Sequence, residues 1–126
     1  MRLLGTLAVL MACIIGTGFW LGCSLETSAD KLSYQIDKVN AEIKRDCWEA
    51  AVEENAKLEQ AWNGEAKWWP IFLDHQEMDN IEFCMARLKG YINGQDYSLS
   101  VGQLSELKLM IQHIPEKEAV NLKNIL

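Results

Sequence analysis

An uncharged apolar stretch at the N-terminus is the feature that most constrains how this chain can fold. The 23 residues from Leu3 to Leu25 include no Asp, Glu, Lys or Arg, and Arg2 stands immediately before them. A helix of about 20 apolar residues crosses a bilayer, so this stretch is long enough to span one with some tilt. Trp20 falls near its outer end, where an amphipathic ring suits the interface. The positive-inside rule then predicts that Arg2 is cytoplasmic and that the chain from Glu26 onward lies outside the cytoplasmic membrane.

Three modes of attachment fit this stretch. We favour an uncleaved signal anchor, because the apolar run exceeds the usual h-region of a cleaved signal peptide, about 7 to 15 residues, and no clear A-x-A site follows. A cleaved signal peptide is the second alternative. The third is a bacterial lipoprotein, since Trp20-Leu21-Gly22-Cys23 resembles a lipoprotein cleavage box with Cys23 as the lipid-bearing residue. Trp20, however, stands where a small aliphatic residue is usual. Two of the three alternatives leave the mature protein attached to the membrane.

After the membrane segment of residues 1–25, we expect residues 26–126 to form a separate extracytoplasmic domain made of helices. Their apolar residues recur at helical spacing, and no long period-2 alternation interrupts them. A first helix is expected to begin near Thr27 or Ser28, and a second at a capping-box-like pair, Asp46 and Glu49. An Asn-Gly pair at positions 63 and 64 is a typical helix stop. The residues expected to face the core from these two helices are Leu32, Ile36, Val39, Ile43, Trp48, Ala51, Val52, Leu58 and Trp62.

A break and two further helices are expected after position 64. Pro70 disfavours a helical backbone at Trp69. Asp74 and Glu77 form a second capping-box-like pair that opens a third helix, which an Asn-Gly pair at positions 93 and 94 ends. Pro115 is expected to close or bend a fourth helix before a short C-terminal helix. Their inward residues are Met78, Ile81, Met85, Leu88, Ile92, Leu104, Leu107, Ile111 and Ile114.

The connections between these helices are short, so consecutive helices should pack antiparallel. The expected fold class is therefore all-α, with an N-terminal transmembrane helix followed by a small antiparallel bundle of about four helices and a short C-terminal helix.

Charge and motif content exclude several classes of function. The chain carries 18 acidic and 12 basic residues, and the part beyond position 23 has a net charge of −7. Nucleic-acid binders need a basic stripe, which is absent from the sequence, so we expect no nucleic-acid partner. The same negative charge would not attract the domain to anionic lipid. The sequence holds no Gly-rich phosphate loop, nucleophile elbow or H-E-x-x-H motif. We therefore expect neither a cofactor nor catalytic activity.

Both histidines stand beside carboxylates, which raises the question of a metal site. If the third and fourth helices are antiparallel, His75 at the start of one lies near His113 toward the end of the other. Asp79 lies one helical turn after His75 and can complete a zinc or iron site. The alternative, which we favour, is structural: His113 complements the dipole at the end of its helix, while Asp74 caps the next one.

Aromatic residues and cysteines also admit two interpretations each. Trp68, Trp69 and Phe72, with Trp62 nearby, can line a ligand or partner surface, although core packing is the interpretation we favour. The four cysteines, at positions 13, 23, 47 and 84, do not form a metal-binding pattern. The cysteines at 47 and 84 can pair in an oxidising exterior, or they can be buried free thiols, which we favour.

Several strings in the domain carry a resemblance to a known family. They are Phe72-Leu73-Asp74-His75, Asn80-Ile81-Glu82, Ala86-Arg87-Leu88-Lys89-Gly90-Tyr91-Ile92, Leu104-Ser105-Glu106-Leu107-Lys108, His113-Ile114-Pro115-Glu116-Lys117-Glu118 and Asn121-Leu122-Lys123-Asn124-Ile125-Leu126. The chain resembles the bacterial family called domain of unknown function 4363, found mostly in Gram-positive organisms. The resemblance implies a small membrane-anchored helical protein and implies no activity.

These features together predict a membrane-anchored helical protein that acts as a non-catalytic accessory or interaction module. It would sit on the outer face of a Gram-positive cytoplasmic membrane, with the membrane and a membrane or envelope protein as its partners. The alternative is an extracytoplasmic domain that senses a ligand or a metal through His75 and His113.

Overall fold

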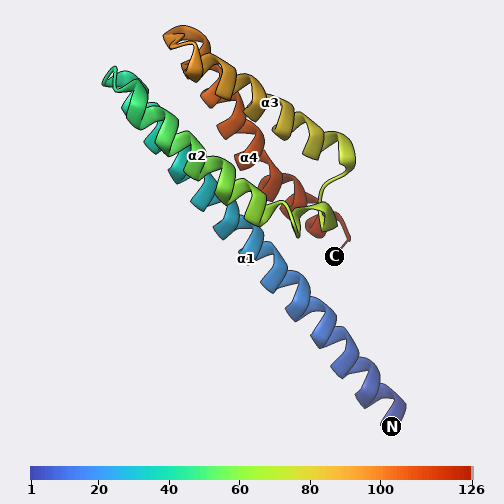
Figure 1. Cartoon of the computed structure of the whole chain (residues 1–126). Coiled ribbons are helices and arrows are strands. Elements are labelled where there is room, and N and C mark those ends of the chain that lie inside the picture. Colours follow the sequence, from blue (N-terminus) through green and yellow to red (C-terminus); the bar gives the residue numbers. More distant parts are fainter. Residues whose placement is uncertain (126) are drawn as a thin grey trace.

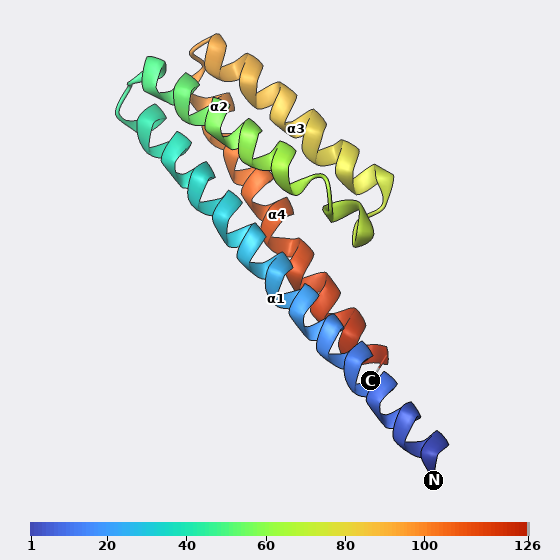
Figure 2. The same ribbon diagram turned by 60° about the horizontal axis from the view of Figure 1, so that its bottom comes forward.

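The chain folds into helices joined by short turns, as a computed structural model shows. It describes the backbone of residues 1–125 and the side chains of residues 1–115. The elements are α1 (Arg2–Lys44), α2 (Trp48–Glu65), the 3-10 helix η1 (Trp69–Ile71), α3 (His75–Asn93) and α4 (Tyr97–Ile125). The described residues contain no strand, so the all-α fold class is confirmed. Figures 1 and 2 show a bundle from which the N-terminal part of α1 projects as an arm.

α1 is one continuous helix that joins the apolar stretch to the bundle, so the expected start of a helix near Thr27 or Ser28 is wrong. The Thr27 hydroxyl donates to the carbonyl of Cys23, 2.9 Å away and one turn back, and therefore does not cap a new helix. No residue before Leu25 is buried, whereas Leu25 is 1% exposed. The bundle core therefore begins at Leu25.

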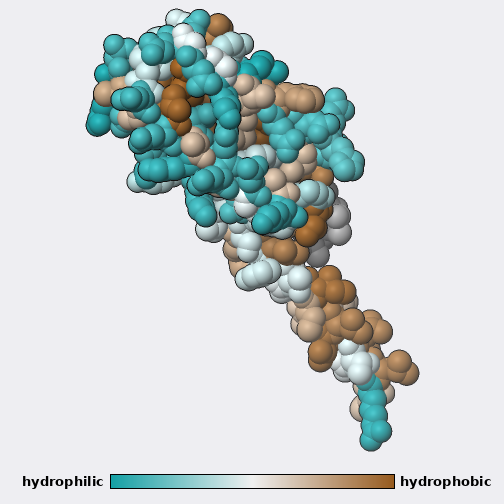
Figure 3. All heavy atoms as spheres, in the orientation of Figure 1, coloured by the Kyte–Doolittle hydropathy of each residue, from teal (hydrophilic) through white to brown (hydrophobic). Residues whose placement is uncertain are grey.

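The projecting arm is apolar along most of its length (Figure 3). Among the described residues, α1 is the one helix that is long and apolar enough to cross a membrane, and none of that apolar window is buried against the rest of the chain. An apolar helix that finds no cover within its own protein needs an apolar solvent.

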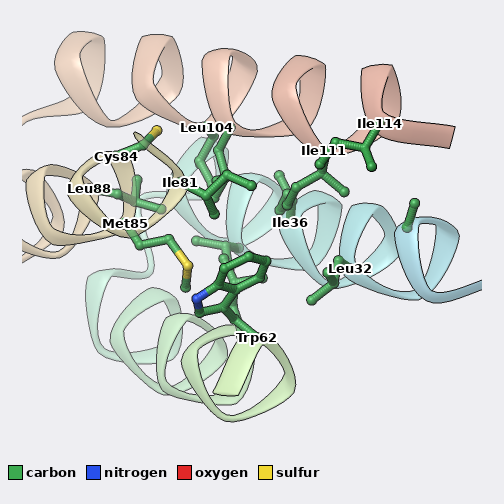
Figure 4. Packing of buried hydrophobic residues seen from close by; sticks show 14 of the residues in the cluster. Leu32, Ile36, Trp62, Ile81, Cys84, Met85, Leu88, Leu104, Ile111 and Ile114 are labelled. Carbon is green, nitrogen blue, oxygen red and sulfur yellow. The ribbon is translucent and has the colours of Figure 1, made fainter. Parts of the chain in front are cut away.

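The bundle consists of two antiparallel hairpins, α1 with α2 and α3 with α4. α4 packs against α1, which joins the two hairpins (Figures 1 and 2). The expected core is confirmed in all but two positions, and Figure 4 shows how its side chains meet between the helices. Trp48 is only partly buried, and Val52 is 43% exposed. The buried stripe of α2 consists of Ala51, Asn55, Leu58 and Trp62, which follow one another at steps of four, three and four residues. Val52 lies outside this stripe.

The same tight turn closes both hairpins. The amide of Cys47 donates to the carbonyl of Glu42, and that of Asp96 donates to the carbonyl of Tyr91, each at 3.0 Å. These bonds, which run from the amide of the third residue after the helix to the carbonyl of the third residue from its end, are typical of a Schellman motif. They satisfy carbonyl groups that the helix end would otherwise leave without donors.

The middle residue of each turn has a left-handed backbone. Asp46 has φ of 61° and Gln95 has φ of 54°. The capping box expected at Asp46 is therefore wrong: Cys47 is the N-cap of α2, and the Asp46 carboxylate accepts a 2.8 Å hydrogen bond from the Trp48 indole. Gly94 is the C-cap of α3, as expected, but Gln95 after it carries the left-handed conformation.

The second predicted cap is confirmed, and the predicted effect of Pro115 is partly wrong. The Asp74 carboxylate accepts a 2.8 Å hydrogen bond from the amide of Glu77 at the start of α3. Pro115 lies inside α4 and does not close it, so the expected short C-terminal helix is a continuation of α4. Proline removes one backbone donor, while Ile111 and Ile114 just before it hold α4 in the core.

The cysteines are all free thiols, and only one lies in the core. Cys84 is buried, as expected, whereas Cys47 is exposed in the turn before α2. The expectation of a buried thiol is therefore wrong for Cys47, because its position as an N-cap places it outside the helix packing.

Candidate functional site

A groove between the outer helices α2 and α3 is one hollow of the bundle. It has a volume of about 320 Å³ and is lined by Glu59, Trp62, Asn63, Glu82, Met85, Ala86 and Lys89. The two hairpins pack together mainly through α1 and α4, and α2 and α3 make far less contact with each other. The groove lies between α2 and α3. The hairpin arrangement therefore leaves α2 and α3 partly apart.

The groove has an apolar floor and a charged rim. Trp62 is 3% exposed and Met85 is 6% exposed, and Figure 4 shows the Met85 side chain reaching toward the Trp62 indole. The Lys89 ammonium lies 3.5 Å from the Glu59 carboxylate and so links the two helices across the groove. Ligand sites commonly combine such an apolar floor with a few polar groups at the rim.

Trp62 brings an unused hydrogen-bond donor to this floor. Its indole N–H is buried and has no acceptor within the part of the chain that the structure describes. Its ring is held in place by Trp69, whose ring centroid lies 5.3 Å away in a T-shaped arrangement. An unpaired buried donor is costly, so Trp62 packs in the core without the hydrogen bond that its neighbour Trp69 makes.

Of the aromatic residues expected at a ligand or partner surface, Trp69 lies in the core. It is 0% exposed, and its indole N–H donates to the Ser28 hydroxyl at 2.9 Å. Trp68 and Phe72 are each partly exposed, with ring centroids 5.7 Å apart. The hydrogen bond of Trp69 therefore fixes η1 to α1, and of these three aromatic residues only Trp68 and Phe72 reach the surface.

A second hollow lies where α1 leaves the bundle. It has a volume of about 490 Å³ and is lined by Trp20, Cys23, Ser24, Thr27, Ser28, Lys31, Glu65 and Trp68. The Glu65 carboxylate accepts a 2.7 Å hydrogen bond from the Trp68 indole, and its other oxygen is 3.9 Å from the Lys31 ammonium. Cys23, the candidate lipid-bearing residue, is exposed on α1 beside this hollow; its lipidation stays a prediction.

The residues of the hypothetical metal site are placed on α3 and α4 without forming a cluster. His75 and Asp79 are exposed on the first turns of α3. His113 lines a cavity of about 200 Å³ with Glu77, Asn80, Ile81, Met110 and Ile114, and neither His75 nor Asp79 is part of this lining. Within the described residues, no three His, Cys, Asp or Glu side chains are grouped so that they can hold a metal ion.

The structural alternative for His113 also needs correction. α4 continues past His113 to Ile125, so the imidazole lies inside the helix and not at its C-terminal dipole. The cap by Asp74 is the part of that alternative that the structure confirms.

Two groups with shifted pKa values lie on the helix interfaces. The Gln35 side chain donates to the Glu54 carboxylate at 2.9 Å and Lys57 approaches it at 3.1 Å, and these hydrogen bonds lower the pKa of Glu54. Burial raises the pKa of the Cys84 thiol, against the opposing effect of a 2.7 Å hydrogen bond from the Gln103 amide. The Gln35–Glu54 contact joins α1 to α2 and the Gln103–Cys84 contact joins α4 to α3, so both contribute to holding the bundle together.

Comparison with known proteins gives one match. The profile of a family described as a domain of unknown function (DUF4363) matches residues 19–125, which is most of the chain. Searches of curated proteins and of solved structures found no match.

Proposed function

The chain belongs to the family described as domain of unknown function 4363, and from its geometry we propose that it is a membrane-anchored, non-catalytic accessory module. Its groove between α2 and α3 would receive a helix or peptide segment of a membrane or envelope protein. The anchor would be α1, with the bundle on the outer face of the cytoplasmic membrane.

The observation that carries this proposal is the groove with its apolar floor and charged rim. A helix in a groove presents an apolar anchor to the floor and polar groups to the rim. The Trp62 and Met85 floor fits such an anchor, and the Glu59 and Lys89 side chains at the rim fit polar groups on the same segment. Partners recognised in this way do not need a bound cofactor or a chemical step.

The continuity of α1 supports a partner close to the membrane. Residues 25–44 of α1 lie within the bundle, and at 1.5 Å per residue they span about 30 Å. The groove would therefore lie no more than about 30 Å above the bilayer, where it can reach membrane proteins and the inner part of an envelope. The single positive side chain before the apolar stretch, Arg2, favours the outer face for the bundle.

The absence of catalytic motifs from the sequence supports a binding role. The sequence holds no phosphate loop, nucleophile elbow or H-E-x-x-H motif, and both histidines are exposed. The groove itself contains acids, an amide, a lysine and apolar groups, without a histidine, serine or cysteine.

Site-specific photo-crosslinking of the full chain in cells tests the proposal. A photoreactive amino acid is placed at Ala86 in the groove and, as a matched control, at Ser105 on α4, because both positions are exposed and lie on different helices. We expect one dominant membrane or envelope protein from the Ala86 probe, absent from the Ser105 probe and diminished by Trp62→Phe. Equal capture from both positions, or capture of the chain by itself alone, would overturn the proposal.

A further inference from the structure

We propose that the η1 turn enters the interface of the same bilayer that α1 spans, so that the protein contacts the membrane at two points. We call Trp68, Pro70, Ile71 and Phe72 the η1 patch. The inference rests on the membrane anchor of the proposed function, but it does not depend on the groove or on any protein partner.

The fold places the η1 patch beside the outer end of the apolar stretch. Trp68 lines the same hollow as Trp20 and Cys23 of α1. The Trp69 indole donates to the Ser28 hydroxyl at 2.9 Å, which fixes η1 against α1 just where the core begins. Both ribbon views show the turn between α2 and α3 at the end of the bundle from which the arm of α1 projects (Figures 1 and 2).

The length of the membrane span sets the height of this patch. About 20 helical residues cross the hydrocarbon core, so a span that begins at Leu3 ends near Gly22. Trp20 then lies at the hydrocarbon edge, and Trp68 lines a hollow that extends along α1 from Trp20 to Lys31. Ser28, which holds η1 through Trp69, lies about 9 Å beyond Gly22, just outside a headgroup region that is about 5–8 Å deep. The η1 patch is therefore held at the outer edge of the interfacial layer, beside the end of the span.

The chemistry of the patch fits that layer. Ile71 is 73% exposed, and Pro70 beside it is exposed as well. Trp68 and Phe72 are partly exposed rings, and the Trp68 N–H is already paired with the Glu65 carboxylate at 2.7 Å. Tryptophan is enriched where an apolar environment meets water, and exposed apolar side chains at that height exchange water for lipid.

Two features favour lipid as the occupant. The patch lies beside the outer end of the α1 arm, an apolar helix that the rest of the chain does not cover, and Trp68 lines one hollow with Trp20 of that arm. The part of the chain beyond position 23 has a net charge of −7, so the contact is apolar and does not require anionic lipid. Neutral phosphatidylcholine is therefore a sufficient probe.

Fluorescence of single labelled positions tests the inference in the full chain. Cys13, Cys23 and Cys47 are changed to Ala, Cys84 stays buried, and one of Leu10→Cys, Ile71→Cys or Leu99→Cys carries an environment-sensitive nitrobenzoxadiazole label. Each protein is reconstituted into phosphatidylcholine vesicles with and without doxyl-labelled phosphatidylcholine. Leu10 lies in the apolar arm, and Leu99 is an apolar, 50% exposed control near the start of α4, at the far end of the bundle.

We expect the lipid-borne doxyl group to quench the labels at positions 10 and 71 and to leave the label at 99 unaffected. Quenching at position 10 alone would overturn the inference while leaving the membrane anchor intact. Quenching at none of the three would remove the anchor and the inference together. A blue-shifted label at 71 that the lipid does not quench would mean that protein covers the patch, which also overturns the inference.

Discussion

Among residues 1–125, two that are not glycine adopt a left-handed backbone, and each lies at the middle of a helix-to-helix turn. Gln95 has φ of 54°, a conformation that costs an L-residue about 1–2 kcal/mol, whereas glycine loses roughly 0.5–1 kcal/mol of chain entropy there. We therefore expect Gln95→Gly to raise the free energy of unfolding by about 0.5–1 kcal/mol. Urea denaturation followed by far-UV circular dichroism measures the change.

The neighbouring glycine provides the matched control. Gly94 has an ordinary φ of −82°, and a Cβ added there would meet the Gly90 carbonyl at 3.4 Å, an ordinary contact. Gly94→Ala should change the free energy of unfolding by no more than about 0.5 kcal/mol. A large loss at Gly94, or none of the expected gain at Gln95, would contradict this account of the turn.

Two buried tryptophans differ in whether the indole N–H has an acceptor. Trp69→Phe removes the bond to the Ser28 hydroxyl and leaves that hydroxyl without its donor, at a cost of about 1–3 kcal/mol on top of the smaller ring. Trp62→Phe removes a donor that has no acceptor within the described residues, so it should cost less. Thermal melts of both variants compare them directly, and an equal loss of stability would show that the indole bond contributes nothing.

The buried thiol of Cys84 should make the free energy of unfolding fall at alkaline pH. Burial raises the pKa of its thiol in the folded state, so the thiol contributes stability below its unfolded pKa of about 8.5, and this contribution is lost as the pH rises through the folded value. Between pH 7.5 and 9.5 we expect the urea midpoint of the wild type to fall more than that of Cys84→Ala. Cys47, which is exposed, should react with a thiol reagent in the folded protein well before Cys84 does. An equal pH response of the two proteins would contradict the burial argument.

At the scale of helices, the pairing of α3 with α4 decides the metal question. His113 faces a cavity lined by Glu77, Asn80 and Ile81, while His75 lies at the exposed start of α3. We expect zinc to bind the wild type no more tightly than the His75→Ala, His113→Ala double variant in a calorimetric titration. A wild type that binds at least about tenfold more tightly, a difference of roughly 1.4 kcal/mol, would restore the sensing hypothesis.

The sequence predicted the core of α3 and α4 because their apolar residues follow the helical period without interruption. From Met78 to Ile92 every expected inward residue is buried, and so are those from Leu104 to Ile114. The start of a helix near Thr27 was predicted wrongly because a hydroxyl residue after an apolar run resembles a cap, whereas here it bonds back into the same helix. The continuation through Pro115 was missed because packing on the core outweighs the local preference of proline.

At the scale of the whole molecule, the groove could not have been predicted from periodicity. Helical spacing reports which face of each helix is buried, but it contains no information on how far the two hairpins separate. Trp62 was expected in the core and is found there, yet its position on the floor of the groove depends on Met85 and on the ion pair between Glu59 and Lys89. Such contacts join residues on different hairpins, and no local pattern records them.

The joint between arm and bundle gives a prediction for the molecule as a whole. Every residue before Leu25 is outside the core, so a fragment of residues 22–126 should be soluble and unfold cooperatively. A fragment of residues 30–126 loses Leu25 and Ala29 from the core and also Ser28, the acceptor for Trp69. One buried leucine contributes about 2–5 kcal/mol, and total stability is about 5–15 kcal/mol, so the shorter fragment should melt at a clearly lower temperature or fail to fold.

Size-exclusion chromatography and thermal melting by circular dichroism distinguish the two fragments. If both melt alike, the first turns of the buried part of α1 contribute nothing to the bundle, and the core begins later than Leu25. If neither fragment folds, the bundle depends on the arm for its stability. Helix formation in the arm would then be needed to stabilise the remainder of α1. The expected difference between the fragments would instead make the bundle an independent folding unit whose core begins at Leu25 of α1.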